Sequence, residues 1–439
     1  MEKEEVLKTV DHDEIDFIDL MFCDLYGNLK SVTISPRELE DCLSDGKWFD
    51  GSSIEGFTRI HESDMLLIPD VSTYLRLPWP RGERNVARII CDVHEPSKNP
   101  FVGDPRYILK RVLARAEKKG YAYNVGPEIE FFLLRSRENR AYHDTAGYFD
   151  FSPQDYATDI RALMVSTLEK LGIKVEMTHH ECAPSQHEID VQYSDALSTA
   201  DNVMMLKQAI KTVASDKGLH ASFMPKPIYG VNGSGMHTHQ SIFNKDGQNL
   251  FHREGDKYNL SPLAYHFMGG QLRYIREIAA ILCPTVNSYK RLVRGYEAPV
   301  YICWGQRNRS ALIRVPRYSE GRVKSTRLEL RCPDPSCNPY LAFATMLAAG
   351  LEGIEKKIEP PTPVEEDVYE FDDRRLAKFY IKTLPADLKE AIQEFEKSKL
   401  VKETLGEHTF HKYLAVKSTE WSEFQRSVTD WEVERYRNL

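Results

Sequence analysis

Two glutamates that alternate with bulky apolar residues form the stretch of this sequence best suited to chemistry. Residues 126–134 read GPEIEFFLL, in which only Ile129 separates Glu128 from Glu130. Successive side chains of a strand point to opposite faces, so both carboxylates leave one face while Ile129 and Phe131 face a core. Carboxylates this close repel each other unless a cation lies beside them, and a divalent metal ion commonly fills that role. The alternative is an exposed strand edge with solvated charges, which an isolated Glu-x-Glu favours.

Further candidate metal ligands lie on other strand-like segments of the chain. They are Glu181 and Glu188, which flank a proline-containing loop, Glu329 in RLELR, and His237 in NGSGMHTH. Taken alone, each has a structural explanation, and a single histidine more often makes hydrogen bonds than binds metal. As a set, many carboxylate oxygens with one imidazole suit Mg²⁺ or Mn²⁺ better than zinc, which prefers sulfur or several histidines. Two such ions side by side predict phosphoryl transfer.

A cationic cluster occupies a short part of an otherwise acidic chain. Its members are Lys290, Arg291, Arg294, Arg307, Arg309, Arg314, Lys324, Arg327 and Arg331. Salt bridges on a solvated surface are one explanation. The other is a set of guanidinium groups that bind phosphate and carboxylate, because the planar fork of arginine suits both anions. Gly233-Ser234-Gly235 could also let backbone approach a ligand, although a single Gly-x-Gly indicates little by itself.

Composition limits the classes of function. The 439 residues, 41% of them hydrophobic, are enough for two or three domains with cores. A formal net charge of -8 excludes a global basic field for nucleic acid or an anionic membrane. The eight cysteines are scattered without a Cys-x-x-Cys, which indicates reduced thiols in the cytoplasm. The acidic amino terminus is unlike a secretory signal, and no apolar run has the length of a membrane span.

The first part of the chain predicts a small α+β domain over residues 1–103. Ser35-Pro36-Arg37-Glu38 is a helix start, with a cap residue, proline at the first helical position and glutamate three residues after the cap. A turn at residues 25–28 predicts a hairpin. We expect a helix at residues 3–10 and strands at residues 15–23, 29–34, 65–68 and 86–93.

The larger domain, residues 104–439, repeats a helix followed by a strand three times. Its helices are predicted from Asp104-Pro105 to Gly120, from Ser152-Pro153 to Leu171-Gly172, and over residues 199–217. The strands that follow are residues 126–134, 173–177 and 221–224. The connections are longer and more polar than in a doubly wound sheet, so we expect a largely antiparallel sheet with helices on one face. The predicted fold class is α+β.

The end of the chain has helical periodicity over residues 338–358, 386–405 and 420–439. The last of these helices carries five large apolar residues, Trp421, Phe424, Val428, Trp431 and Tyr436. A terminal helix this aromatic either docks on its own domain or contacts a neighbouring subunit, and the sequence leaves both possibilities open.

An ordered set of motifs in this sequence resembles type I glutamine synthetase. The motifs are FDGSS (residues 49–53), GPEIEFF, HHECAPSQHEID, KPIYGVNGSGMHTHQS (residues 226–241), KRLVRGYEAP (residues 290–299), RNRSALIR (residues 307–314) and RLELRCPDPSCNPYLAF. The resemblance extends from near residue 15 to the carboxy terminus. Seven long motifs in family order are too many for coincidence, so the functional explanations above are favoured over the structural ones.

The resemblance implies a small amino-terminal β-grasp-like domain and a larger catalytic domain with a mostly antiparallel curved sheet flanked by helices. It implies a dodecamer of two stacked hexameric rings, with active sites between neighbouring subunits. The implied activity is ATP-dependent ligation of ammonia to L-glutamate through γ-glutamyl phosphate, in cytoplasmic nitrogen assimilation. Two or more Mg²⁺ or Mn²⁺ ions would serve each active site.

The resemblance implies a role for each residue that matches a functional position of the family's motifs. One metal would bind Glu130, Glu181 and Glu188, and the other Glu128, His237 and Glu329. Glutamate would contact Glu181, Asn232, Gly233, Arg291, Glu297, Arg309 and Arg331, and ATP would contact His239, Ser241, Arg309, Arg314 and Lys324. The implied catalytic residues are Asp50, Glu297, Arg309 and Arg331. Asp50 of the neighbouring subunit would bind ammonium and take its proton, and Glu297 would close the site as a flap.

Two departures from the family pattern concern the flap and regulation. Arg294 stands where the family usually has the proline of RLVPGYEAP, which predicts a looser or differently tethered flap. The tyrosine motif NLYDLP, used for adenylylation in some relatives, is missing after Ile358. The segment around Arg59 resembles the non-adenylylated alpha-type subgroup of archaea and Gram-positive bacteria, so Arg59 is a candidate for feedback inhibition by glutamine. The sequence does not say whether 2-oxoglutarate or a nitrogen-signalling protein regulates the enzyme.

Two other functions compete with this interpretation. A γ-glutamyl ligase for a polyamine or alkylamine shares the metal site, but such relatives often alter the DGSS region, whereas this chain keeps Asp50 and Ser53. A non-catalytic scaffold of the same fold is the other alternative. It would have no reason to keep so many mutually repelling carboxylates, because without metal they destabilise the fold.

Overall fold

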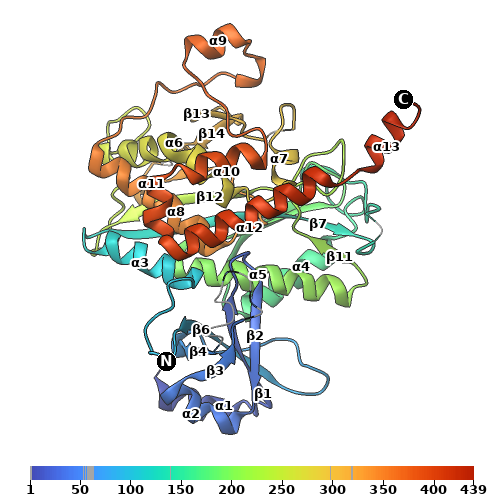
Figure 1. Ribbon diagram of the computed structural model, residues 1–439, viewed down its shortest axis with the longest axis vertical. Coiled ribbons are helices and arrows are strands. Elements are labelled where there is room, and N and C mark those ends of the chain that lie inside the picture. Colours follow the sequence, from blue (N-terminus) through green and yellow to red (C-terminus); the bar gives the residue numbers. More distant parts are fainter. Residues whose placement is uncertain are drawn as a thin grey trace.

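The computed structural model describes residues 2–52, 54, 56, 64–138, 140–296, 298–317 and 320–439. Three residues named above, Ser53, Arg59 and Glu297, lie outside the described residues. A small amino-terminal sheet lies below a larger body of sheet and helices in Figure 1, and the carboxy terminus extends away from that body. Within the described ranges, no helix is both long and apolar enough to cross a membrane.

The amino-terminal sheet has the strand order β2-β1-β6-β4-β3, with β5 beside β6. β1 and β2 form the predicted antiparallel hairpin, whereas β1 and β6 run parallel. The predicted helix start at Ser35 is confirmed, since its hydroxyl accepts the Arg37 N–H and the helix follows at once. The elements are α1 (Lys3–His12), β1 (Phe17–Cys23), β2 (Leu29–Ile34), η1 (Pro36–Glu38), α2 (Leu39–Asp45), β3 (Lys47–Asp50), β4 (Asp64–Pro69), η2 (Val71–Thr73), β5 (Leu75–Arg76) and β6 (Val86–His94).

The large sheet is built around one long strand, β7 (Ala122–Leu134). Its order is β13-β14-β15-β12-β7-β9-β8, and β10 and β11 also pair with β7. All of these pairs are antiparallel except β13 with β14, which confirms the predicted α+β class. The other strands are β8 (Val175–His180), β9 (Gln186–Val191), β10 (Ser194–Asp195), β11 (His220–Ser222), β12 (Met236–Phe243), β13 (Tyr301–Gly305), β14 (Ala311–Arg314) and β15 (Leu328–Leu330).

Helices surround this sheet, and one of them, α6, has no counterpart in the sequence analysis. α6 packs closely on α8, and a Cβ atom added at Gly270 would lie 2.2 Å from the Ala349 carbonyl oxygen. The glycine therefore allows the two helix backbones to approach. The helices of the larger domain are α3 (Pro105–Glu117), α4 (Thr158–Lys170), α5 (Ala196–Asp216), α6 (Pro262–Leu282), α7 (Ser288–Arg291), α8 (Pro339–Lys356), α9 (Asp373–Lys378), α10 (Leu388–Glu396), α11 (Lys399–Leu405), α12 (Glu407–Arg426) and α13 (Asp430–Tyr436), with 3-10 turns η3 (Val323–Ser325) and η4 (Val368–Glu370).

Three of the predicted helices differ from those of the structure. The helix expected from Ser152-Pro153 begins only at Thr158, because the Asp155 side chain accepts the Ala157 N–H and forms the local turn. The helix expected over residues 386–405 is two helices, α10 and α11, because Ser398 caps the second one. The helix expected over residues 420–439 begins earlier, at Glu407, and is also two helices, α12 and α13, since Thr429 forms a capping box with Glu432.

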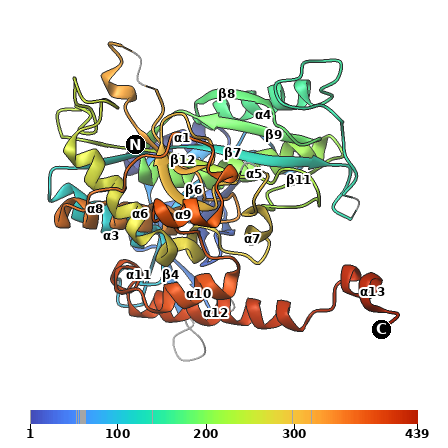
Figure 2. The same cartoon turned by 90° about the horizontal axis from the view of Figure 1, so that it is seen from above.

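The break before α13 divides the aromatic residues of the predicted last helix. Trp421 of α12 packs against the main hydrophobic core. On and just before α13, by contrast, Val428, Trp431 and Tyr436 are 75%, 62% and 50% exposed. Figures 1 and 2 both show α13 standing clear of the body. The first half of the segment therefore docks on its own domain, and the second half does not.

Candidate active site

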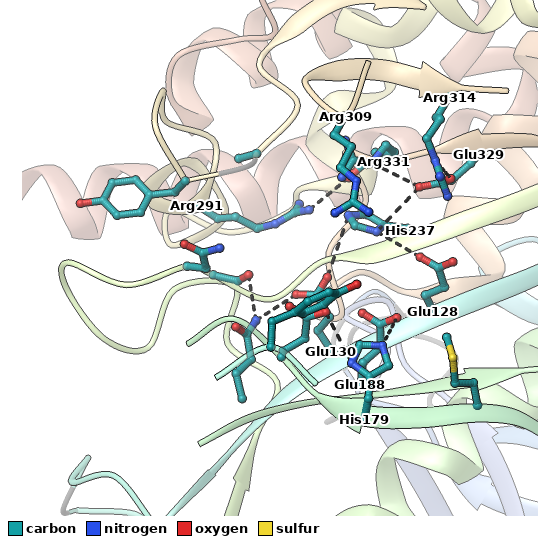
Figure 3. A pocket seen from close by; sticks show the side chains of 18 residues that line it. Glu128, Glu130, His179, Glu188, His237, Arg291, Arg309, Arg314, Glu329 and Arg331 are labelled. Atoms are coloured by element: carbon teal, nitrogen blue, oxygen red, sulfur yellow. Dashed lines mark hydrogen bonds and ion pairs between the residues drawn. The ribbon is translucent and has the colours of Figure 1, made fainter. Parts of the chain in front are cut away.

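A cavity lies over the large sheet, where β9, β7, β12 and β15 run side by side. It contains every described residue to which the resemblance assigned metal or glutamate contacts. Arg309 and Arg331 lie across the cavity from Glu130 and Glu188 in Figure 3. The lining residues are Glu128, Glu130, Tyr148, Met177, His179, Glu181, Gln186, Glu188, Asn232, Gly233, His237, Arg291, Tyr296, Ala298, Arg309, Arg314, Glu329 and Arg331.

Strand register brings these acidic residues together from distant parts of the chain. Glu128 on β7 lies opposite His237 on β12, and Glu130 lies opposite Glu188 on β9. Glu329 on β15 is brought in through the pairing of β15 with β12. Ile129 is fully buried between the two glutamates of β7, as the alternation predicted. The pleat therefore places one row of carboxylates on the cavity face.

Glu128, His237 and Glu329 form a compact group whose candidate ligand atoms all lie within 4.8 Å of one another. His237 Nδ1 is 3.2 Å from Glu128 Oε2 and 4.0 Å from Glu329 Oε1. Burial lowers the pKa of His237 despite the neighbouring carboxylates, so its imidazole is neutral and able to bind a metal. Two carboxylates and a neutral imidazole fit a divalent ion.

The other predicted set, Glu130, Glu181 and Glu188, is crowded with negative charge. Burial and the neighbouring Glu181 raise the pKa of Glu130 to about 8. Burial and Glu130 likewise raise the pKa of Glu188 well above its usual range. Carboxyl groups in this state take up either protons or a cation. The donor chemistry of this set also fits a divalent ion.

Two residues missed by the sequence analysis lie beside Glu188. Its carboxylate forms a compact group with His179 and Asp190, with candidate ligand atoms within 4.8 Å of one another. Among the described residues, the predicted trio of Glu130, Glu181 and Glu188 does not form a group that compact. Asp190 lies opposite Glu128 in the pairing of β7 with β9. The sequence held a signal for it, because alternation along HEID places Asp190 on the same strand face as Glu188.

His239, predicted to contact ATP, lies beside the metal ligands. Its Nε2 is 2.6 Å from Glu128 Oε1, and its Nδ1 accepts a hydrogen bond of 3.1 Å from Arg327 Nε. Since arginine can only donate, the histidine proton lies on Nε2 and is donated to Glu128. His239 thereby orients this carboxylate, in the way that outer residues orient metal ligands. Arg327 belongs to the cationic cluster of the sequence, but the resemblance assigned it no contact.

Burial would raise the pKa of Glu128, but His239 and His237 hold it well below its usual range. The pKa of Glu329 is also lowered despite burial, because the guanidinium groups of Arg314 and Arg331 favour its charged form. Arg314 Nε is 2.5 Å from Glu329 Oε2. Basic neighbours therefore favour the charged forms of Glu128 and Glu329, whereas burial and mutual repulsion disfavour the charged forms of Glu130 and Glu188.

Arg291 is held in the cavity wall by hydrogen bonds to the backbone. It is buried, and its guanidinium donates to the carbonyl oxygens of Arg331, Cys332 and Pro333. A Cβ atom added at Gly235 would lie 2.5 Å from Arg291 Nη2. A Cβ atom added at Gly233 would lie 2.3 Å from the Pro225 carbonyl oxygen, so both glycines of the Gly-x-Gly that indicated little in the sequence allow a close approach.

Arg331 offers an unsatisfied donor within the cavity wall. Its Nη1 atom is buried and has no hydrogen-bond partner in the part of the chain that the structure describes. A buried guanidinium N–H without an acceptor is costly, and an anionic group bound in the cavity would supply one. The arginine side of the site is therefore suited to a carboxylate or phosphate.

Four predicted residues lie outside the cavity lining. Asp50 is exposed at the end of β3 in the amino-terminal sheet. Ser241 is buried on β12, and Lys324 is exposed in η3. His239 contacts Glu128 from outside the lining. Glu297 and Arg59, which complete the predicted set, lie outside the described residues.

Comparison with known proteins gives matches over nearly the whole chain. Residues 14–96 match the glutamine synthetase beta-Grasp domain, and residues 102–436 match the glutamine synthetase catalytic domain. The glutamine synthetase of Methanosarcina mazei is 52% identical, covering 100% of this chain and 98% of that protein. The glutamine synthetase of Thermotoga maritima is 50% identical over 99% of each chain. A solved GmaS/ADP complex is 33% identical and superposes with a TM-score of 0.90 over 99% of each chain.

Proposed function

This chain belongs to the glutamine synthetase family, and we propose that its cavity performs the ATP-dependent ligation of ammonia to L-glutamate through γ-glutamyl phosphate. Its activity is that of a glutamate–ammonia ligase, which releases ADP and phosphate together with glutamine. The observation that carries the proposal is the strand register, which places Glu128 opposite His237 and Glu130 opposite Glu188.

The family uses ATP and a divalent metal ion, and we propose two Mg²⁺ or Mn²⁺ ions per site. Glu130, Glu181 and Glu188 would hold one ion, and Glu128, His237 and Glu329 the other. The proposal is supported by the ligand types and by the raised pKa of Glu130, about 8, and of Glu188. When bound, the ions polarise phosphoryl oxygens and offset their charge. His239, held by Arg327, keeps the Glu128 carboxylate oriented toward its ion.

In the first step the γ-phosphoryl group moves from ATP to the side-chain carboxylate of glutamate. The bond from γ-phosphorus to the bridging oxygen breaks, a new bond to the carboxylate oxygen forms, and ADP leaves. Arg309, Arg314 and Arg331 offset charge on the transferring group. Arg291, fixed by three backbone carbonyls, presents its remaining N–H groups to the α-carboxylate of glutamate. Glu181 binds the amino group of glutamate, and Asn232 and Gly233 complete its site, while His239, Ser241 and Lys324 contact ATP.

In the second step ammonia attacks the acyl carbon and phosphate leaves. Asp50 of a neighbouring subunit takes a proton from ammonium, which makes the nucleophile. Glu297 closes the site, keeps water from the acyl phosphate and receives a proton from the adduct. The support for these two roles is the resemblance of the FDGSS and GYEAP segments.

The protein acts as an oligomer on small-molecule substrates, and we propose the family's dodecamer of two stacked hexamers. Asp50 does not line the cavity of its own chain, so a site that uses it needs a second subunit. Val428, Trp431 and Val433, which are more than half exposed at the end of the chain, form an apolar surface that a neighbouring subunit would cover. We place the domain boundary between residues 103 and 104, where Asp104 caps α3, and the enzyme in the cytoplasm.

The decisive assay is ATP-dependent phosphate release with Mg²⁺ and glutamate, run with ammonium, with putrescine and without amine. We expect release to require ammonium and to match glutamine formation one for one. Release with putrescine alone would move the assignment to a polyamine ligase. No release in any mixture would favour a non-catalytic scaffold.

Exchange of Arg294 for proline tests whether this departure from the family pattern, just before the GYEAP flap, loosens the flap. The Arg294 guanidinium lies over the Tyr301 ring, 5.2 Å from its centroid, so this chain tethers the segment through a side chain. Arg294→Pro should tighten the flap, because proline fixes φ, and should reduce the share of acyl phosphate lost to water. Glutamate-dependent phosphate release and glutamine yield are compared with those of the unaltered enzyme. Identical values would remove this role.

Feedback inhibition by glutamine is proposed to depend on Arg59. The support is the sequence alone: the segment after DGSS resembles the non-adenylylated alpha-type subgroup, and NLYDLP is absent. Arg59→Ala should raise the glutamine concentration needed for half inhibition by about tenfold, since a charged contact is lost. Inhibition curves at fixed glutamate measure this, and an unshifted curve would exclude Arg59. We propose a nitrogen-signalling protein as a partner in the same control.

A further inference from the structure

A buried guanidinium binds three aspartates where the amino-terminal sheet meets the catalytic domain. Arg106, in the first turn of α3, is only 2% exposed. Its Nε and Nη2 atoms donate to the two carboxylate oxygens of Asp201 on α5, both at 3.0 Å. Nη2 also donates to Asp70 at 2.8 Å, and Nη1 donates to Asp92 at 2.7 Å. One side chain therefore joins two acidic residues of the amino-terminal sheet to the catalytic domain.

The partners of Arg106 are themselves held in place. The Tyr340 hydroxyl on α8 donates to Asp201 at 2.7 Å, and Lys110 Nζ lies 2.5 Å from Asp92. Burying charged groups costs several kcal/mol for each ion unless pairing and hydrogen bonds offset it, so such networks contribute more to defined geometry than to net stability. The planar fork of arginine also fixes the angle between its partners, which an ammonium group cannot do.

The two aspartates of the amino-terminal sheet hold one end of the strand that supports Asp50. Asp70 directly follows β4, and Asp92 on β6 lies opposite Ile68 of β4. The other end of β4 pairs with β3, where Asp64 lies opposite Asp50. A hydrogen-bonded strand resists bending, so the orientation fixed at Asp70 extends along β4 to Asp50.

We propose that Arg106 is a positioning residue that fixes the amino-terminal sheet on the catalytic domain and thereby places Asp50 at the neighbouring subunit's cavity. This inference rests on the proposed role of Asp50 in binding ammonium. In the proposed ring, neighbouring catalytic domains would meet, so an error in the angle between the two domains of one chain would displace Asp50 from its target. A displaced Asp50 carboxylate contacts ammonium poorly, so ammonium binds more weakly, while the sites for ATP and glutamate, which belong to the catalytic domain, are unchanged.

The test is Arg106→Lys in the assembled enzyme, with Arg81→Lys as the matched control. Arg81, in the loop between β5 and β6, pairs with Asp19 of β1 at 2.8 Å, so both residues belong to the amino-terminal domain and their ion pair does not reach the catalytic domain. For Arg106→Lys we expect the KM for ammonium to rise about tenfold or more, while the KM values for ATP and glutamate stay within about twofold. Amide hydrogen exchange in β4 and β6 should become faster. Arg81→Lys should change none of these values.

An unchanged ammonium KM, or a fall in kcat with no selective change in KM, would overturn the positioning role. If Arg106→Lys does not assemble, Asp70→Asn removes one charge while keeping the side-chain shape, and it should shift both readouts in the same direction. Asp50→Asn distinguishes a wrong role for Asp50 from a wrong role for Arg106. If that variant keeps a normal ammonium KM, the mechanism of ammonium binding is wrong. Unchanged exchange in β4 and β6 of Arg106→Lys would then separately overturn the fixing of the domains.

Discussion

Replacing Glu130 with glutamine is expected to abolish most glutamine synthesis while making the metal-free protein more stable. Glu130 is buried, and it accepts hydrogen bonds from Gln186 Nε2 at 2.9 Å and from the Gly235 N–H at 3.0 Å. The amide oxygen of glutamine can still accept these bonds, so the fold loses little. The variant lacks one charged metal ligand, and losing about 3 kcal/mol of Lewis-acid stabilisation lowers kcat about 100-fold.

The gain in stability depends on pH in a defined direction. Burial and Glu181 raise the pKa of Glu130 from 4.5 to about 8 in the folded chain. Between these values the folded state holds a proton that the unfolded state has released, so the free energy of unfolding falls as pH rises from 4.5 to about 8. Glutamine does not ionise, and this slope should weaken in the variant.

Thermal unfolding at several pH values, with EDTA and with Mn²⁺, measures both effects. The unaltered protein should gain more stability from Mn²⁺ than Glu130→Gln does, because metal binding is linked to folding. Glu176→Gln is the control, since Glu176 is an exposed residue of the same sheet. A Glu130→Gln protein with full activity and the same response to Mn²⁺ would contradict the ligand assignment.

Replacing Asp50 with asparagine is expected to impair the use of ammonium and leave the use of ATP and glutamate intact. Asp50 is exposed on β3, and its carboxylate accepts the Ser52 N–H at 2.8 Å. Asparagine keeps that acceptor but cannot take a proton from ammonium, so glutamine formation should fall by about 100-fold or more. Glutamate-dependent ATP cleavage should continue, with acyl phosphate lost to water.

Mixed oligomers can show whether Asp50 works in a neighbouring subunit. Asp50→Asn and Glu130→Gln chains, coexpressed in equal amounts, would form about one quarter of their sites from an intact cavity and an intact Asp50. Activity well above that of either variant alone is therefore expected. Mixtures no more active than the separate variants would mean that Asp50 does not act across a subunit boundary.

Local sequence patterns predicted elements whose signals lie within a few residues. Alternation in GPEIEFFLL gave β7 with its two inward glutamates, and the caps at Ser35 and Asp104 gave two helix starts. Helical periodicity failed to predict helix ends where a capping side chain interrupts the pattern. Ser398 and Thr429 begin new helices inside stretches whose periodicity alone predicted continuous ones. Side-chain caps of this kind compete with helix continuation, and periodicity does not register them.

The long, ordered family motifs predicted the candidate site, and the structure brings the described residues assigned to metal and glutamate contacts into one cavity, but not Asp50, Ser241 or Lys324. The sequence did not assign the residues that support them. His179 and Asp190 beside Glu188, and Arg327 behind His239, have roles only once β7, β9, β12 and β15 are paired in register.

The sequence by itself determined the class of elements, the acidic and cationic residues of the site and, through its motifs, the family. Only the tertiary structure decided which charged side chains form ion pairs and hydrogen bonds with one another. Arg106 and Asp201 are 95 residues apart in the chain, and no local pattern links them. Strand register and helix packing are set by burial of apolar faces across the whole molecule, so contacts such as this one follow from the assembled fold rather than from any short segment.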